Sequence, residues 1–393
     1  MNNRTPLVLL AMVSALGPMA IDMGLPALPA LEQGFALATG QGALTLTVFL
    51  LGFGLSPVLS GLLSDRFGRK RVLTVSLFAF SLFALLCSLA ENYTWLLIFR
   101  VLQGLFAGAS VALPIAIVRD QIAETRAGPY IARIAMIVGL APIVAPALGT
   151  LVLTFSGWRG IYLAQAALGL ALTVWCLASL SDRPDFKPGR FAGIVGILRS
   201  ARQVYGNRGF LLPTLIYATL FSAMFSFLTA APAVFIQDLG FSELHLILVL
   251  ALTSCGMFSG SLLNSYLLRH SHAKPVTLIR ISCMVAFMAC LLLAMIALAT
   301  QPHYSVIVLF CWLLVFVFGI SAPSSNHQAI YALDTHRGLG AGFIRTIQML
   351  MAAAAGTATS LLTTLIPALT AFALVMAVMA TAALLIFWYW QRQ

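Results

Sequence analysis

The feature that most constrains this chain is a series of long apolar runs separated by short polar or charged breaks. An α-helix needs about 20 apolar residues to cross the hydrocarbon core of a bilayer, and each run reaches roughly that length. The pattern therefore predicts an all-α integral membrane protein with twelve transmembrane helices. The predicted spans lie near 6–31, 41–63, 72–90, 94–118, 128–154, 158–180, 209–236, 243–268, 275–299, 304–329, 338–364 and 367–390.

The composition indicates that lipid is the main solvent. Of the 393 residues, 61% are hydrophobic and 8% are charged, whereas ordinary soluble domains have about 25% charged residues. A soluble fold of this length could not cover its surface with so few charges. The six cysteines lie in apolar stretches without metal-ligand or C-x-x-C spacing, and we expect no metal and no cofactor.

The basic residues predict the orientation. If the N-terminus is cytoplasmic, all 22 Lys and Arg residues except Arg100 and Arg159 fall on or near the cytoplasmic side. This agrees with the positive-inside rule and argues against nucleic-acid binding as the reason for the net charge of +11. We expect a multi-pass protein of the bacterial inner membrane with both termini cytoplasmic. The first run resembles a signal peptide, but it continues to about Leu31, so we expect it to be retained.

The polar stretch 181–207 divides the twelve runs into two sets of six. We expect residues 1–180 and 208–393 to form two pseudo-symmetric six-helix bundles, joined by a cytoplasmic linker over 181–207. Within that linker, the pattern over 190–205 predicts a short basic amphipathic helix. Such a helix would lie on the anionic inner leaflet and tether the two bundles.

The break between the second and third runs reads GLLSDRFGRKR over 61–71. It resembles G-x-L-x-D-R-x-G-R-K, the cytoplasmic signature of the major facilitator superfamily, whose members are transporters with two six-helix bundles. Glycines allow a tight turn and close helix approach, and an acid at a span end can pair with a cation or a helix N-terminus. Membrane anchoring alone would require only the basic residues. We expect a cytoplasmic latch formed by Gly61, Asp65, Arg66, Gly68 and Arg69.

Three further motifs resemble the drug/proton antiporter branch with twelve spans. The first is R-x-x-Q-G over 100–104. The second is GLAPIVAPALG over 139–149, similar to the A-P-x-x-A-P-x-x-G motif of the Bcr/CflA (bicyclomycin/chloramphenicol resistance) subfamily. The third is IDMGLPALP over 21–29, close to I-D-M-x-L-P-x-x-P of that subfamily. In the second motif, Gly139, Pro142, Pro146 and Gly149 predict a notched, bendable helix that can approach a neighbour of the other half. The resemblance implies that this helix seals a leak.

Two charges are expected inside the membrane. Asp22 is the carboxylate that we place in the hydrocarbon core, where a charge costs about 2.5–3.5 kcal/mol on insertion scales. We expect it to take up and release the transported proton. Arg100 cannot lose its proton; its approach to Asp22 would expel the proton, with Gln103 orienting it. The structural alternatives are an Asp22 that caps a break in span 1 and an Arg100 bonded to helix carbonyls.

The substrate contacts are predicted from polar and aromatic residues in the spans. An aromatic-lined cavity with few polar groups suits a lipophilic ligand, although such faces also serve helix packing. Arg345 departs from the small or apolar residue expected in span 11 and leaves the charge of the pocket open. The candidates are Tyr217, Phe221, Phe225, Gln165, Asn326 and Gln348.

These residues predict a proton-coupled exporter of small lipophilic drugs, neutral or cationic, with Asp22 exchanging a proton for substrate by alternating access. The alternative is a proton-coupled transporter of one metabolite, such as a nucleoside, an amino acid or a siderophore. A membrane-embedded enzyme or sensor is a third hypothesis, but the sequence lacks a nucleophile elbow, a phosphate loop or a soluble domain. We therefore expect no enzymatic activity, and a monomer whose partners are substrate, protons and membrane lipids.

Overall fold

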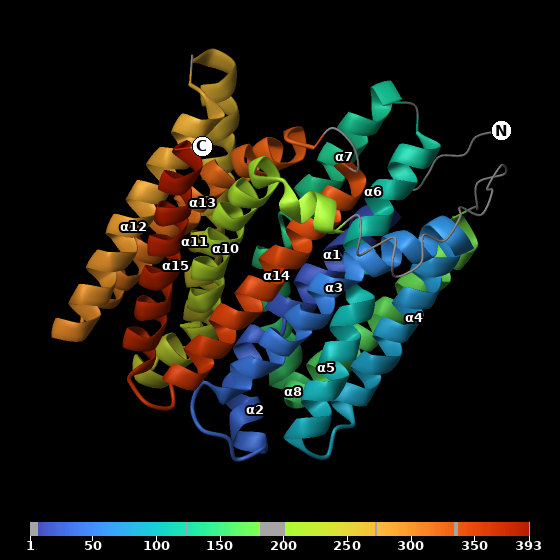
Figure 1. Cartoon of the computed structure of the whole chain (residues 1–393). Helices are drawn as coiled ribbons and strands as arrows, with labels where there is room; N and C mark the ends of the chain where they lie inside the picture. Colours follow the sequence, from blue (N-terminus) through green and yellow to red (C-terminus); the bar gives the residue numbers. More distant parts are fainter. Residues whose placement is uncertain (1–6, 123, 181–200, 272, 334–336, 393) are drawn as a thin grey trace. The chain divides into compact units, whose positions relative to one another are not determined.

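The computed structural model describes residues 7–122, 124–180, 201–271, 273–333 and 337–392, and these residues form helices without strands (Figure 1). The helices before the predicted linker are α1 (Leu7–Asp22), η1 (Leu25–Ala27), α2 (Leu28–Gly34), η2 (Gln41–Ala43), α3 (Leu44–Phe67), α4 (Arg69–Ser88), α5 (Tyr93–Ala107), α6 (Ala109–Gln121), α7 (Glu124–Val138) and α8 (Ala141–Ser179). Those after it are α10 (Arg208–Pro232), η3 (Ala233–Asp238), α11 (Glu243–His270), α12 (Pro275–Ala299), α13 (Tyr304–Tyr331), α14 (Arg337–Leu362) and α15 (Ala368–Gln391).

The number of spans agrees with the sequence. Within the described ranges, 11 helical segments are long and apolar enough to cross a membrane. One of them, 127–179, has 53 residues, which corresponds to about 80 Å of helix, more than twice the ~30 Å core. It is interrupted at Gly157, where φ is 61° and ψ is −171°. This segment therefore holds two spans, and the predicted all-α membrane architecture is confirmed.

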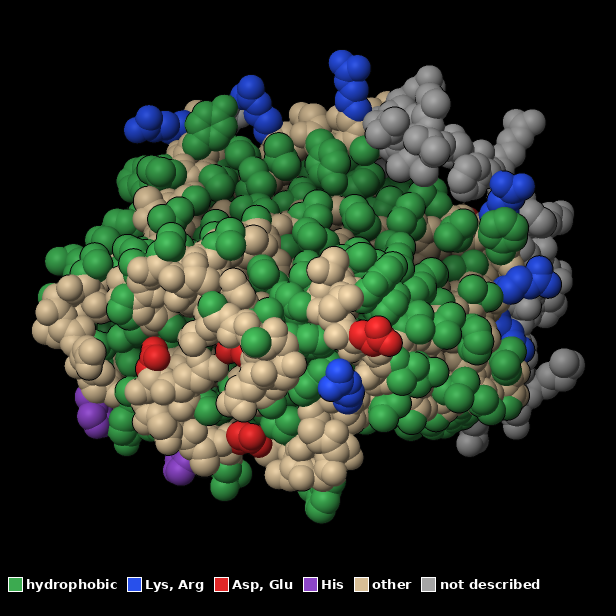
Figure 2. Space-filling view, turned by 90° about the horizontal axis from the view of Figure 1, so that it is seen from below, with side chains coloured by type: hydrophobic (Ala, Val, Ile, Leu, Met, Phe, Trp, Pro, Cys, Tyr) green, Lys and Arg blue, Asp and Glu red, His purple; other side chains and the backbone are tan. Residues whose placement is uncertain are grey.

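Hydrophobic side chains also cover the outside of the helices. In the view from below in Figure 2, hydrophobic side chains cover much of the surface, and the charged groups are few and scattered. Large apolar side chains such as Phe155 and Leu298 are 82% and 65% exposed. Lipid, rather than water, is the solvent that such a surface requires.

Prolines break several spans into two successive helices. Pro26 lies in η1 and has no N–H, so the helical bond to the carbonyl of Asp22 cannot form, and α1 ends at Asp22. Pro142 likewise cannot donate to Val138, the last residue of α7. The interrupted backbone thus occurs beside the acid and in the A-P-x-x-A-P segment.

Glycines bring paired helices close together in the same manner in both halves of the chain. In the first half, a Cβ on Gly104 of α5 would overlap the carbonyl oxygen of Phe49 in α3. In the second half, a Cβ on Gly260 of α11 would overlap the carbonyl oxygen of Phe316 in α13. Small residues that let backbones approach are the usual basis of helix packing in membranes.

Contacts divide the chain into two units. The first runs to Ala30 and resumes at Val48, and the second contains Leu31–Thr47 together with the second set of helices. The predicted linker 181–207 and its amphipathic stretch 190–205 fall mostly on 181–200, outside the described residues. The segment Leu31–Thr47 was assigned by sequence to the first half. Its hydrogen bonds to Gln237 in η3 and Ser360 in α14 account for its place in the second unit.

Candidate functional site

A buried polar network in the first unit extends from Arg100 to α1. Nη1 of Arg100, in α5, donates to Oε1 of Gln103 at 2.8 Å. Nε2 of Gln103 donates to Oε1 of Gln165 in α8 at 2.9 Å, and Nε2 of Gln165 donates to the carbonyl oxygen of Ala20 at 3.3 Å. The network thus reaches the backbone of α1 two residues before Asp22.

The guanidinium of Arg100 lies in an enclosed, aromatic environment. Arg100 is 1% exposed. Its Cζ lies 4.4 Å from the ring centroid of Phe49 and 5.5 Å from that of Tyr162. Aromatic faces attract a cation, most strongly where water is excluded. The sequence predicts Asp22 or helix carbonyls as partners of Arg100, and the structure adds the Gln103 amide and two rings.

Asp22 lies at the end of α1 and is buried, with 9% exposure. Among the described residues, its carboxylate makes no hydrogen bond or ion pair. The next residue, Met23, touches α8, because a Cβ on Gly149 would overlap the Met23 carbonyl oxygen. With the Gln165 bond to Ala20, α8 contacts the backbone of the first span on both sides of Asp22.

The A-P-x-x-A-P segment positions this contact. Gly139 lies between α7 and α8, and Pro142 falls in the first turn of α8. Pro146 and Gly149 are buried farther along α8. The segment therefore starts a helix whose small face, at Gly149, packs against the first span. Its predicted role in sealing a leak stays a prediction.

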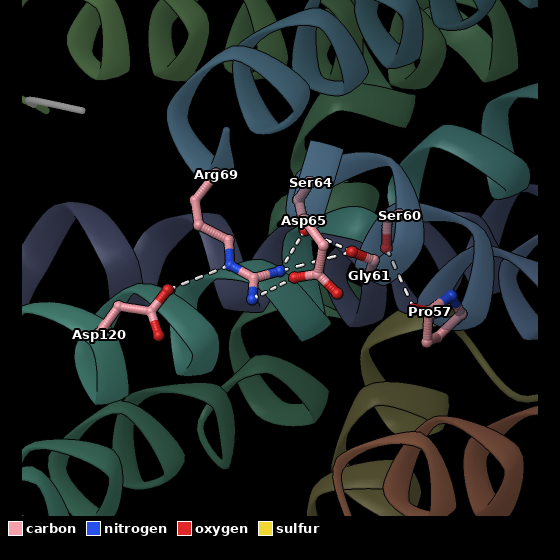
Figure 3. A network of polar contacts seen from close by, with 7 residues as sticks. All are labelled: Pro57, Ser60, Gly61, Ser64, Asp65, Arg69 and Asp120. Atoms are coloured by element: carbon pink, nitrogen blue, oxygen red, sulfur yellow. Dashed lines mark hydrogen bonds and ion pairs between the residues drawn. The ribbon is translucent and has the colours of Figure 1, made fainter. Parts of the chain in front are cut away.

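The loop between α3 and α4 contains a network of ion pairs around Arg69 (Figure 3). Nη2 of Arg69 lies 2.6 Å from Oδ1 of Asp65, and its Nε lies 3.2 Å from Oδ2 of Asp120 at the end of α6. Nη1 donates to the Ser64 hydroxyl and, at 3.5 Å, to the carbonyl oxygen of Gly61. Arg69 therefore links α3, α4 and α6 within the first unit.

The other members of the predicted latch have separate roles. Gly68 joins α3 to α4 with φ 93°, a conformation that L side chains rarely adopt. Cζ of Arg66 lies 5.3 Å from the ring of Phe67. A Cβ on Gly61 would meet nothing within 4 Å. At Gly61, therefore, no neighbouring helix approaches closely in this structure, although the sequence predicts a close approach there.

Four of the predicted substrate contacts lie together in the second unit. Tyr217 stacks on Phe318 at 5.6 Å between centroids, and Phe221 lies 5.7 Å from Phe318 and 6.3 Å from Phe225. Nη1 of Arg345 donates to the Tyr217 hydroxyl at 3.0 Å. The fourth predicted contact, the Gln348 amide, accepts from the same nitrogen at 2.9 Å.

The two remaining candidates lie elsewhere. Gln165 belongs to the Arg100 network of the first unit. Nδ2 of Asn326 donates to the Ala322 carbonyl oxygen at 3.0 Å, a bond within α13. Their predicted roles as substrate contacts stay predictions.

Comparison with known proteins assigns the family. The family model described as Major Facilitator Superfamily matches residues 10–357. The chain belongs to this superfamily.

Relatives of this major facilitator protein include transporters with a resistance function in their names. It is 27% identical over 332 residues to multidrug resistance protein MdtL of Escherichia fergusonii, covering 84% of this chain and 82% of that protein. This chain is 26% identical over 302 residues to the MFS-type transporter YdgK of Bacillus subtilis (strain 168). The match covers 76% of this chain and 75% of that protein. These similarities identify the chain as a multi-pass membrane transporter.

Solved structures share the fold of this major facilitator protein. A D-xylose-proton symporter matches with a TM-score of 0.77 at 14% identity, covering 97% of this chain and 96% of that one. A POT family transporter in complex with 5-aminolevulinic acid matches with a TM-score of 0.77 at 14% identity. The match covers 98% of this chain and 95% of that one. The major facilitator fold predicted from sequence is confirmed.

Sequence reasoning missed several residues of these clusters. Asp120 could have been found, because it is an acid at the end of a predicted span, beside Arg119. The aromatic residues around the two arginines carried no signal, because Phe and Tyr occur throughout the spans. The missed residues are Phe49, Ser64, Asp120, Tyr162 and Phe318.

Proposed function

We propose that this transporter exports small lipophilic molecules in exchange for protons, and that Asp22 carries the proton. The observation that supports this most directly is the pair of α8 contacts on either side of Asp22. An ionisable side chain inside a membrane span is costly and is commonly a functional group. Here it lies where α1 meets the parts of α8 before and after Gly157, so a change in its charge acts on the packing of α1 against both.

Arg100 is the second element of the proposed mechanism. It stays protonated, and its amide chain through Gln103 and Gln165 ends on α1. A shift along α1 of the part of α8 after Gly157 would therefore move the Gln165 amide that holds Gln103, and the field of Arg100 at Asp22 would change. Approach of this charge favours loss of the proton, and withdrawal favours its uptake.

Proton exchange supplies enough free energy for efflux. One charge moving through ~100 mV contributes ~2.3 kcal/mol. At ~1.36 kcal/mol per factor of ten, this sustains a substrate gradient of roughly 50-fold. Export of the substrate and entry of the proton then alternate within one transport cycle.

Orientation and environment belong to the same proposal. The distribution of Lys and Arg supports a bacterial inner membrane with both termini cytoplasmic. We infer a monomer surrounded by lipid. In this orientation the Arg69 network lies on the cytoplasmic side, where it would act as the latch between transport states.

The test is substrate-induced proton release from purified protein in detergent, with chloramphenicol and tetraphenylphosphonium as neutral and cationic probes. The native protein should release protons, and Asp22→Asn should not. Ser14→Ala is the matched control, because the Ser14 hydroxyl bonds within α1, to the Leu10 carbonyl oxygen at 2.8 Å. Equal release from native protein and Asp22→Asn would overturn the role of Asp22.

Transport of a single metabolite is the competing function. A panel that includes nucleosides, amino acids and siderophores separates the two. Proton release by one such compound, with none from structurally unrelated drugs, would favour the metabolite transporter.

A further inference from the structure

We propose that Arg345, with Tyr217 and Gln348, binds an anionic group of the substrate, and that the neighbouring aromatic rings hold its apolar body. This inference rests on the proposed transport function and specifies its substrate class. It replaces the neutral or cationic drugs expected from sequence with molecules that carry a carboxylate or a similar anion.

The first argument is the depth of Arg345. It lies eight residues after Arg337, where α14 begins, so it is about 12 Å along the helix. Its partner Tyr217 lies nine residues after Arg208, where α10 begins. Both residues therefore lie about a third of the way along their helices, well inside a segment that crosses a hydrocarbon core of ~30 Å. A permanent charge at this depth requires a water-filled cavity or a partner.

The second argument is the contrast with Arg100. Both arginines donate from Nη1 to a glutamine three residues later, at 2.8 and 2.9 Å. Arg100 is enclosed by Phe49 and Tyr162, whereas Arg345 is exposed. Within the described residues, both bonds of Arg345 use Nη1, so Nε and Nη2 remain for a ligand. Such a pair of donors matches the two oxygens of a carboxylate.

The third argument is the lack of a protein counter-charge. The described acids of the second unit are Glu32, Asp238 and Glu243. Asp238 is 21 residues beyond Tyr217 along α10 and η3, which is about 30 Å of helix. Glu32 bonds to the neighbour of Asp238, Gln237. The described acids thus lie toward the other end of these helices, and Arg345 makes no ion pair with them.

The fourth argument is the apolar character of the surroundings. The ring of Tyr217, whose hydroxyl accepts from the guanidinium, stacks on Phe318, and Phe221 lies tilted against Phe318. The hydroxyls of Ser222 and Thr229 on α10 donate to carbonyl oxygens of their own helix. The strong polar group of this cluster is therefore Arg345, and aromatic faces provide the remaining contact area.

The test is equilibrium binding to purified protein in nanodiscs without a proton gradient. The probes are benzoate, 2-naphthoate and anthracene-9-carboxylate, each paired with its neutral primary amide. Native protein should bind at least one carboxylate more than about tenfold tighter than its amide, or ~1.4 kcal/mol. Arg345→Gln should abolish the difference, and Arg345→Lys should retain part of it, because Lys keeps the charge but not the two-donor geometry.

A second arginine and two lipid compositions test whether the preference belongs to Arg345 and to a substrate anion. Arg280→Gln, at another exposed arginine of the second unit, should keep the preference. Nanodiscs with and without phosphatidylglycerol distinguish a lipid head group from a substrate anion. Binding of phosphatidylglycerol at Arg345, without carboxylate preference, would overturn the inference. So would a native protein that does not distinguish any carboxylate from its amide.

The outcome is independent of proton coupling. If chloramphenicol or tetraphenylphosphonium releases protons but no carboxylate is preferred, the transport function stands and the substrate class is wrong. If carboxylates bind through Arg345 but Asp22→Asn releases protons normally, the substrate class stands and the coupling proposal fails.

Discussion

Gly149 of α8 lies against the carbonyl oxygen of Met23, so closely that a Cβ at this position would overlap it. Met23 directly follows Asp22, and the A-P-x-x-A-P segment therefore touches the first span beside its acid. The absence of a side chain at Gly149 therefore allows α8 to lie close to the first span at the proposed proton site.

Gly149→Ala should impair transport and stability together. The added methyl group would push α8 away from α1, and overpacking of this kind costs about 1–3 kcal/mol. The thermal unfolding temperature in detergent and drug transport in vesicles measure the two effects. Gly128→Ala is the control, because a Cβ at Gly128 in α7 meets nothing within 4 Å. Equal behaviour of the two variants would show that the contact with Met23 is not required.

Gln165→Leu distinguishes a network residue from a substrate contact. Leucine removes both hydrogen bonds of Gln165 and leaves a buried amide donor of Gln103 without its acceptor, at a cost of about 1–3 kcal/mol. We expect transport of all substrates to fall by a similar factor. A loss confined to some substrates, seen as a changed KM with unchanged maximal rate, would instead identify Gln165 as a substrate contact.

Arg69→Gln should reduce turnover without much loss of stability. Asp65 and Asp120 are 59% and 33% exposed, and exposed ion pairs contribute only about 0–1 kcal/mol. We expect transport to fall about tenfold, equivalent to ~1.4 kcal/mol in the barrier. Lys70→Gln is the matched control, because Lys70 Nζ bonds to the Leu177 carbonyl oxygen at 3.1 Å. Unchanged turnover in Arg69→Gln would exclude the latch.

Glu32→Ala should release the segment Leu31–Thr47 from the second unit. Glu32 accepts from the Gly42 amide and from Gln237, both at 2.9 Å. The Ser360 hydroxyl holds the same segment through the carbonyl oxygen of Gly40 at 2.6 Å. Hydrogen exchange should become faster over 35–43 in this variant. Gln33→Ala, at an exposed neighbour, should leave exchange unchanged, and identical exchange in both variants would contradict the prediction.

Some features of the site could be predicted because they follow from local sequence. Asp22 and Arg100 stand out because a charge within an apolar run is rare. Gln103 was placed beside Arg100 because residues three apart share a helix face. The glycines and prolines over 139–149 predict a notched, bendable helix, and the structure has the boundary between α7 and α8 there.

The sequence by itself determined the spans, because the length of each apolar run reflects the thickness of the bilayer and the need to satisfy every backbone polar group within it. Only the tertiary structure decided which side chains form hydrogen bonds between different helices. Gln103 and Gln165 are 62 residues apart, and Tyr217 and Arg345 are 128 apart. Such pairs depend on how whole helices are rotated and shifted against one another. Side-chain packing decides this arrangement, and local periodicity does not. For the same reason Leu31–Thr47, early in the chain, belongs with the second unit.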